Sequence, residues 1–322
     1  MTSLGTDTIS APPTGSPASI RLDLAPAVSE REETAQRLLR AAAKRSFDPA
    51  SDIDWTTPIN DDDWFYIPEH RVSLYGTRLW ESMTRRQRIA LSRHEVASMA
   101  QTGIWFELIL MQLLVRFVYD EDLTSHNTDW VLTEIADECR HSSMFARLST
   151  TLGGAQHHVS RRGHLLGRIL KTIADPPEGF AAILIAEELL DTFQRETMVD
   201  EAVHPLVRSV SQLHVVEEAR HVKFAREELE RQMHSVRGVH LQRVRMMTAW
   251  AAAITAHELV QPSCYSAVGL DPREALRAAR ASRVRRDSLT WAASKLTTLF
   301  EDVGLIAAPS RRIWRDAGLL AA

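Results

Sequence analysis

The chain has 322 residues, of which 44% are hydrophobic and 25% are charged, and its formal net charge is -4. These values exclude a fibrous or wholly disordered chain. The slight acidity argues against nucleic-acid binding through the overall field, because neutralising phosphates needs a surplus of Lys and Arg. Its two cysteines cannot form a disulfide framework, and the sequence shows neither a secretion signal nor an uninterrupted apolar stretch of membrane-spanning length. We therefore expect a cytoplasmic protein without nucleic-acid or membrane partners.

The first 76 residues show little helical periodicity outside one segment. Residues 1–26 are rich in Ser, Thr, Pro and Gly and bury too little apolar surface to offset chain entropy, so a disordered tail is predicted. A short amphipathic helix is predicted over 28–46, followed by an irregular segment over 47–76 that carries prolines and three consecutive acids. Residues 27–76 are predicted to pack on a helical domain formed by residues 77–322.

From residue 77 onwards, the sequence is predicted to be helical. Apolar residues recur at i, i+3, i+4 and i+7, and runs of alternating β-branched residues are almost absent. A polar stretch at 120–127, Pro176-Pro177 and Pro205 separate the segments. The fold class is therefore all-α, with helices predicted over 84–119, 128–151, 162–173, 177–202, 205–235, 239–260 and 271–300.

Glu107 stands in a segment that is apolar nearly all round, IWFELILMQLLV. A helix of this kind is buried, and an unpaired ionised carboxylate inside it is strongly destabilising. We expect Glu107 to be protonated, paired with a cation or bound to a metal. Glu95 lies earlier in the same predicted helix among polar residues, and it is predicted to be a solvated acid rather than a ligand.

An ExxH pattern occurs twice. Glu138 and His141 are three residues apart and share a helix face, as do Glu218 and His221. The two copies are offset by 80 residues, and the same offset from position 107 leads to Glu187. The sequence thus contains a weak internal repeat in which Glu is followed, 31 residues later, by ExxH.

Glu188 is a rival of Glu187 for the fourth carboxylate. Glu187 shares its helix face with the apolar Ile183 and Leu190, whereas Glu188 aligns with polar residues. Glu187 is therefore predicted to face inward. In each half, similar helix lengths on either side of the connection bring the two carboxylates of an antiparallel hairpin to one level.

Four helices that deliver Glu, ExxH, Glu and ExxH to one level form a ferritin-like di-iron or di-manganese carboxylate bundle. Four carboxylates balance two divalent cations, which allows them to stand together in an apolar core. Carboxylate and imidazole suit iron or manganese, and iron is the first choice. The repeat predicts that Glu138 and Glu218 bridge both metals, with Glu107 and Glu187 as terminal ligands.

His214 extends the second unit to HxxxExxH. It precedes Glu218 by four residues and His221 by seven, so the three side chains lie on one helical stripe. A third imidazole would raise the coordination number at one metal. The alternative is a polar histidine that lies near the site without a metal bond.

These motifs resemble the p-aminobenzoate N-oxygenase (AurF-type) family of non-heme di-iron oxygenases, in which a further histidine precedes the second ExxH unit. The resemblance covers about residues 77–257; it departs at Glu217, where members of the family can carry Asp. It implies that two iron ions and dioxygen convert an amine, in particular an arylamine, through hydroxylamine and nitroso stages to a nitro compound. The implied metal ligands are Glu107, Glu138, His141, Glu187, His214, Glu218 and His221.

Several questions remain open at the level of sequence. The chain lacks a GxGxxG fingerprint, a P-loop and a thiolate set for an iron–sulfur cluster, so we expect an external electron donor, either a reductase or a ferredoxin-type carrier. A homodimer is also expected. The alternatives are another di-iron oxidation, such as C–H hydroxylation or desaturation, and a non-catalytic ferritin-like iron-binding protein.

Three features receive structural rather than functional interpretations. Arg140 and Arg220 are predicted to point away from the metals and to pair with neighbouring acids or solvent. The tryptophans, Trp250 among them, are interpreted as core residues. The Arg-rich run at 273–286 is interpreted as an exposed helical face, and its function is not assigned.

Overall fold

The computed structural model describes residues 26–154 and 157–321. The tail predicted over 1–26 falls outside these ranges except for Pro26, with which the first helix begins. The longer helices are α1 Pro26–Lys44, α3 Arg85–Val118, α4 His126–Thr151, α5 Arg161–Ile173, α6 Pro176–Thr197, α7 Pro205–Met233 and α8 Gly238–Glu258. The shorter ones are η1 Glu69–Arg71, α2 Arg78–Ser82, α9 Pro262–Ala267, α10 Pro272–Ala281, α11 Arg283–Ala292, α12 Ser294–Asp302 and α13 Arg311–Asp316.

Local sequence signals set where the bundle helices begin. Thr84 and Gln87 form a capping box at the start of α3, and the Ser125 side chain accepts a hydrogen bond from the Thr128 amide at the start of α4. α6 and α7 each begin with proline in the first turn, where a missing N–H costs nothing. These starts fix the hairpins that carry the acids and histidines.

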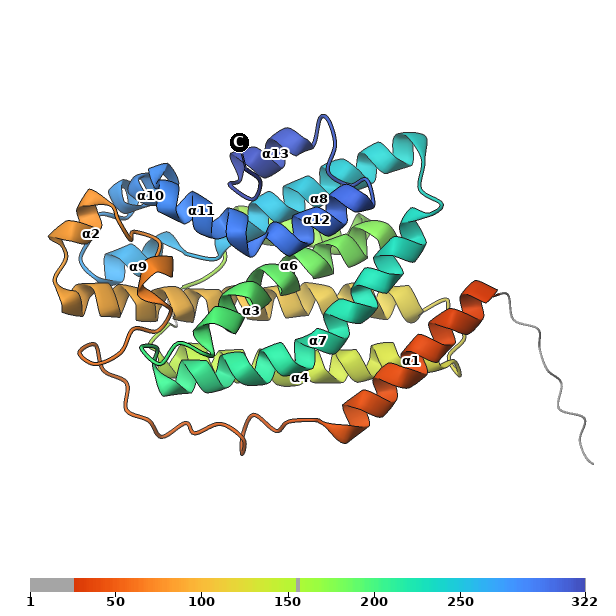
Figure 1. Ribbon diagram of the computed structural model, residues 1–322, viewed down its shortest axis with the longest axis horizontal. Helices are drawn as coiled ribbons and strands as arrows, with labels where there is room; N and C mark the ends of the chain where they lie inside the picture. Colours follow the sequence, from red (N-terminus) through yellow and green to blue (C-terminus); the bar gives the residue numbers. More distant parts are fainter. Residues whose placement is uncertain (1–25, 155–156, 322) are drawn as a thin grey trace, which may run out of the picture.

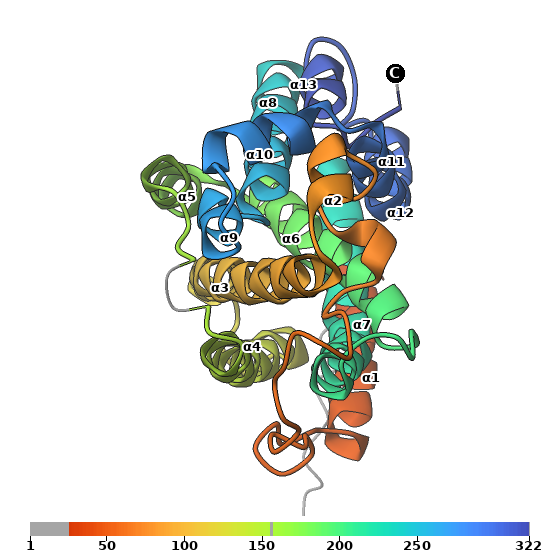
Figure 2. The ribbon, with the colours of Figure 1, turned by 90° about the vertical axis from the view of Figure 1, so that its left-hand side faces the viewer.

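Helices α3, α4, α6 and α7 form a four-helix bundle (Figure 1). α3 packs along α4 and α6 packs along α7, and contacts between α3 and α6 and between α4 and α7 close the bundle. α1 lies across α4 and α7, while α8 and the C-terminal helices lie on the α6 side (Figure 2). This arrangement confirms the all-α, ferritin-like fold.

The helix predicted over 271–300 is wrong. Three short helices, α10, α11 and α12, occupy this region. Ser282 adopts an extended conformation that ends α10, and its side chain accepts a hydrogen bond from the Arg285 amide at the start of α11. Both α11 and α12 pack on α6, so an apolar period continues through the break. The predicted helix over 177–202 also ends early, at Thr197.

The irregular segment before α2 crosses one end of the bundle. The backbone carbonyl of Phe65 accepts a hydrogen bond of 2.8 Å from the His204 amide, at the connection between α6 and α7. The Tyr66 ring stacks on the His204 imidazole with centroids 5.0 Å apart. Within the described ranges, the only strand-like contact is the isolated bridge between Phe65 and Val203. The segment therefore holds the second hairpin at its turn.

α3 is apolar for a reason that its position explains. Among the described helices, it alone has an 18-residue window apolar enough to cross a membrane, with a mean hydropathy of 1.3. Half of that window is buried inside the molecule. A core helix that packs on two others has this composition without any lipid contact.

Candidate metal centre

The bundle interior holds a cluster of acids and histidines to which all four helices contribute. Their donor atoms form overlapping groups in which the members lie within 4.8 Å of one another. Each residue of the cluster is at most 1% exposed. The structure brings together all seven predicted residues: Glu107 from α3, Glu138 and His141 from α4, Glu187 from α6, and His214, Glu218 and His221 from α7.

Two carboxylates lie between the two ExxH imidazoles. Nδ1 of His141 is 2.9 Å from Oε2 of Glu138 and 3.2 Å from Oε1 of Glu218. Nδ1 of His221 is 2.8 Å from Oε1 of Glu138 and 3.0 Å from Oε1 of Glu218. Each carboxylate thus reaches the inner nitrogen of both imidazoles, which is the placement that bridging carboxylates need when each imidazole binds one metal.

Glu107 and Glu187 complete the cluster from α3 and α6. Donor atoms of Glu107, His141 and His214 form one group, and those of Glu187, His214 and Glu218 form another. The two acids therefore belong to different groups that share one imidazole. Terminal binding to two different metals fits this arrangement.

His214 turns one nitrogen towards the cluster and the other towards a fixed partner. Its Nε2 lies 3.8 Å from Oε1 of Glu107 and 3.7 Å from Oε1 of Glu218. Its Nδ1 lies 2.8 Å from the side-chain oxygen of Gln194, which only accepts, so Nδ1 carries the hydrogen and Nε2 keeps its lone pair. Burial lowers the pKa of His214 to about 4, which keeps the imidazole neutral and able to bind a metal.

Several buried donor atoms of the cluster have no hydrogen-bond partner among the described residues. They are Oε2 of Glu107, Glu187 and Glu218 and Nε2 of His214. Buried polar atoms are normally paired, so four orphans in one cluster indicate a missing electrophile. Carboxylate oxygen and imidazole nitrogen are donors that iron and manganese accept. The residues therefore fit a pair of divalent cations.

The four carboxylates divide into two electrostatic pairs. Burial and the neighbouring carboxylates raise the pKa of Glu107 and of Glu187 well above the ordinary value. Burial acts in the same direction on Glu138 and Glu218, but the adjacent imidazoles outweigh it and lower both pKa values, that of Glu138 to about 2. All four carboxylates can ionise together only when cations replace the protons, which links metal binding to proton release.

A second layer of acids orients the two ExxH imidazoles, and it crosses between the hairpins. Nε2 of His141 in α4 lies 2.9 Å from Oε2 of Glu217 in α7. Nε2 of His221 in α7 lies 3.2 Å from Oδ2 of Asp137 in α4. Each acid fixes the ring and the tautomer of the histidine on the other hairpin, and leaves Nδ1 free to face the cluster.

The guanidinium groups of Arg140 and Arg220 lie outside this layer, as predicted. Arg140 lies 3.8 Å from Oε1 of Glu217, and Arg220 lies 3.4 Å from Oδ2 of Asp137. The sequence indicated these acids as partners of arginine but missed their contact with the histidines. Because that contact joins residues of different hairpins, spacing along one helix gives no sign of it.

The prediction that Glu95 is a solvated acid is wrong. Glu95 is 0% exposed, and its carboxylate accepts hydrogen bonds from the amide and the hydroxyl of Ser73. The Ser73 hydroxyl also lies 2.9 Å from the hydroxyl of Tyr265 in α9. The segment after η1 and helix α9 thus cover this face of α3. Burial raises the pKa of Glu95 to about 7, and the residue lies outside the metal-ligand groups.

The sequence analysis missed Gln194 and Glu134. Gln194 follows Glu187 by seven residues on the same face of α6, a spacing that could have revealed the partner of His214. Glu134 lies one turn before Glu138, is 0% exposed, and has no hydrogen-bond partner for either carboxylate oxygen among the described residues. Burial raises its pKa to about 8. The 80-residue offset makes Glu134 the counterpart of His214, a signal that was present in the sequence.

Fold and cluster together define the class of protein. A ferritin-like bundle whose interior groups Glu, ExxH, Glu and ExxH is a dimetal carboxylate protein. The model of the family described as p-aminobenzoate N-oxygenase AurF matches residues 28–304, which is most of the chain. The chain belongs to this family and is an oxygen-dependent oxidoreductase.

Individual relatives are more distant. The uncharacterized protein MT0908 of Mycobacterium tuberculosis is 27% identical over 230 residues, which cover 70% of this chain and 66% of that protein. The uncharacterized protein Mb0909 of Mycobacterium bovis is 28% identical over 211 residues, 64% of this chain and 62% of that protein. The chain thus matches just under two thirds of the length of these curated relatives. Among solved structures, an R2-like ligand-binding oxidase with an aerobically reconstituted Mn/Fe cofactor is 14% identical with a TM-score of 0.42, covering 92% of this chain and 90% of that chain.

Proposed function

We propose that the protein is a non-heme di-iron N-oxygenase that uses dioxygen to convert an arylamine through hydroxylamine and nitroso stages to a nitro compound. The observation that carries this proposal is the third imidazole. His214 is buried and neutral, and its unpartnered Nε2 faces the donor atoms of the cluster. A six-ligand bundle that hydroxylates or desaturates carbon has no need of this histidine or of its Gln194 partner.

Under this proposal, the two irons are held by the cluster. Glu138 and Glu218 bridge, Glu107 and Glu187 bind terminally, and the three imidazoles supply neutral donors, with four carboxylates balancing two divalent cations. The bound irons supply the reaction with dioxygen and the transfer of electrons.

The chain's own residues orient the centre and keep it dry. The second-layer acids hold the hydrogen on Nε2 of His141 and of His221. Gln194 holds the hydrogen on Nδ1 of His214, so that ring cannot turn to present its other nitrogen. The seven proposed ligand residues are at most 1% exposed, which excludes bulk water from the reacting atoms.

The proposal includes partners. Electrons come from a separate reductase or a ferredoxin-type carrier, because the sequence offers no nucleotide fingerprint and no iron–sulfur ligand set. The substrate is a small amine, and the protein acts in the cytoplasm as a homodimer without a nucleic-acid or membrane partner.

Metal analysis followed by product analysis tests the function. The purified protein is expected to bind close to two iron ions per chain, and manganese is measured in the same sample. After reduction and exposure to dioxygen with a panel of arylamines, mass spectrometry should detect nitroso and nitro products. One metal ion per chain, retained zinc, or only hydroxylated or desaturated carbon would contradict the proposal. A large iron-filled cage in solution would favour storage instead.

A further inference from the structure

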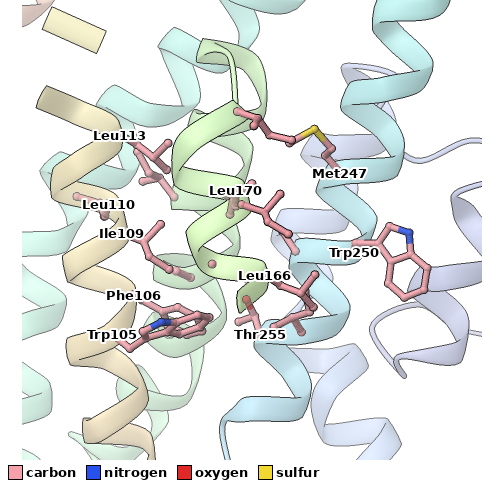
Figure 3. Close-up of a pocket in the computed structure, with 18 residues that line it drawn as sticks. Trp105, Phe106, Ile109, Leu110, Leu113, Leu166, Leu170, Met247, Trp250 and Thr255 are labelled. Carbon is pink, nitrogen blue, oxygen red and sulfur yellow. The ribbon is translucent and has the colours of Figure 1, made fainter. Parts of the chain in front are cut away.

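A cavity of about 420 Å³ lies between α3, α5, α6 and α8 (Figure 3). This volume is in the range that holds one small-molecule ligand. Figure 3 shows Trp105 on α3 and Trp250 on α8 at opposite sides of the cavity, with Leu166 and Leu170 of α5 between them. Trp250 is 55% exposed, so its interpretation as a core residue is wrong.

The inner wall of the cavity adjoins the metal centre. It includes Phe106 and Ala186, the residues that immediately precede Glu107 and Glu187. It also includes Leu110 and Ile183, which lie one helical turn from the same two acids and on the same helix faces. The cavity thus lies beside the two acids that face away from the bridging pair.

The lining carries no charge. None of the 18 described residues that line the cavity has an ionisable side chain, and their polar side-chain groups are the Thr255 hydroxyl and the indole N–H of Trp105 and Trp250. A carboxylate placed among these side chains would lose its hydration without gaining a cation. In p-aminobenzoate, the carboxylate stands at the opposite end of the ring from the amine, so an amine held at the metals would send the carboxylate into this cavity.

We propose that this cavity is the substrate pocket and that it selects an amine whose body is apolar and uncharged, such as an aniline with an alkyl substituent, over carboxylate-bearing arylamines. The requirement for an amine rests on the proposed function, whereas the apolar, uncharged body follows from the lining alone.

The outer wall of the cavity supports this assignment. Leu166, Ile169, Ile173 and Trp250 line the cavity and are between 41% and 55% exposed, so the cavity opens to the surface between α5 and α8. An apolar rim favours the passage of an apolar molecule.

Close packing keeps α5 in place beside this opening. A Cβ atom at Gly167 would lie 2.6 Å from a ring atom of Trp105 and 2.8 Å from Cδ1 of Ile109. The backbone of α5 therefore rests directly on α3, and a single glycine sets the width of the pocket at that point.

A ligand series on the metal-loaded full chain tests the pocket. Binding of anilines with methyl to hexyl groups at position 4 is followed by tryptophan fluorescence, because Trp105 and Trp250 line the cavity. Affinity should rise about threefold to fourfold per methylene until the cavity is full. p-Aminobenzoate should bind at least about 100-fold more weakly than 4-butylaniline. Equal affinities, or affinities that do not depend on chain length, would overturn the proposal.

Two matched leucines on α5 provide the variants. Leu170 lines the cavity, whereas Leu165 does not and is 58% exposed. Leu170→Trp should weaken 4-butylaniline binding about tenfold or more with unchanged metal content, and Leu165→Trp should leave both unchanged. Leu170→Ala should move the best chain length to a longer alkyl group, a gain that misfolding cannot mimic. An unchanged optimum in Leu170→Ala, or equal weakening by both tryptophan variants, would overturn the proposal.

An amine-free probe separates this proposal from the proposed function. Butylbenzene should bind within about tenfold of 4-butylaniline, because the cavity recognises the apolar body. If 4-butylaniline binds but yields no nitroso or nitro product, the N-oxygenase function fails and the pocket stands. If butylbenzene does not bind, or p-aminobenzoate is the better substrate for a nitro product, the pocket assignment fails and the function stands.

Discussion

The two hairpins of the bundle, α3–α4 and α6–α7, differ at one position that faces the metal centre. Both supply Glu and ExxH with the same 80-residue offset, and both supply an acid that orients the histidine of the other hairpin. The second hairpin adds His214, whereas the equivalent position in the first is Glu134. The shared residues thus account for a pair of metals, and the difference accounts for what is particular to this centre.

The surroundings of the two differing residues match their side chains. His214 has Gln194 to hold one nitrogen, while the counterpart of Gln194 in the first hairpin is the apolar Leu114. Glu134 consequently has no hydrogen-bond partner among the described residues and carries a pKa raised to about 8 by burial. One hairpin is built to present a neutral donor to a metal, and the other is built to keep an acid protonated.

The largest effects are expected where the hairpins agree. Glu138→Ala and Glu218→Ala each remove a proposed bridging charge, so each should weaken metal binding more than about 100-fold and abolish oxidation. Metal per chain after dialysis against a chelator measures this. Glu188→Ala is the control, because Glu188 binds Arg226 at 2.6 Å instead of the cluster. Loss of metal in only one of the two variants would break the equivalence of the hairpins.

The second layer should give smaller and again paired effects. Asp137→Asn and Glu217→Gln each replace the acid that orients a histidine of the opposite hairpin, so each should cost about 10–100-fold in metal affinity. Asp129→Asn on the exposed face of α4 is the control and should cost nothing. Competition with a chelator of known affinity gives the values. If either substitution leaves the affinity unchanged, the crossed contacts do not orient the ligands.

The third prediction addresses the position where the hairpins differ. His214→Ala should keep the fold and most of the metal, because the other six ligands still balance the charge, while formation of the nitro product falls about 10–100-fold. Glu134→Gln, at the equivalent position, should keep metal and product within about twofold. Metal per chain and product yield are measured together. If His214→Ala matched the unaltered protein in yield, His214 would be a bystander and the third-imidazole argument would fail.

How far the sequence reached depended on whether a feature repeats along one chain segment. The bundle and the seven residues of the cluster were predictable, because 3.6-residue periodicity and the offset between the ExxH units are properties of single helices. The role of Asp137 and Glu217 was not predictable, because their histidine contacts join separate hairpins. The same holds for Glu95, whose polar sequence neighbours say nothing of the α9 and η1 segments that cover it.

The break in the C-terminal helix illustrates the same limit at a smaller scale. Apolar periodicity runs on through Ser282, since α11 and α12 both pack on α6, so the period alone indicates one helix. The turn at Ser282 depends on a single side-chain hydrogen bond to the Arg285 amide. The cavity beside α5 was also beyond the sequence, because its walls come from four helices and its width from one glycine.

The smallest expected effect concerns stability alone, at a second position where the hairpins differ. Glu95 in α3 is buried, whereas its counterpart by the 80-residue offset, Asp175 before α6, is exposed. Burial raises the pKa of Glu95 in the folded protein to about 7, above its value in the unfolded chain. Its contribution to stability is therefore complete below about pH 4.5 and is lost as the pH rises through about 7.

Glu95→Gln should remove this pH dependence, because the amide oxygen still accepts from the Ser73 amide but never ionises. The variant should gain on the order of 2 kcal/mol relative to the unaltered protein between pH 5 and pH 8, or a few degrees in melting temperature. Asp175→Asn should show no such gain. Thermal unfolding at both pH values measures the difference, with metal content as a check, since Glu95 lies 12 residues, or about 18 Å, along α3 from Glu107. A pH-independent difference for Glu95→Gln would mean that Glu95 is ionised throughout, with its charge met by the Ser73 amide and hydroxyl.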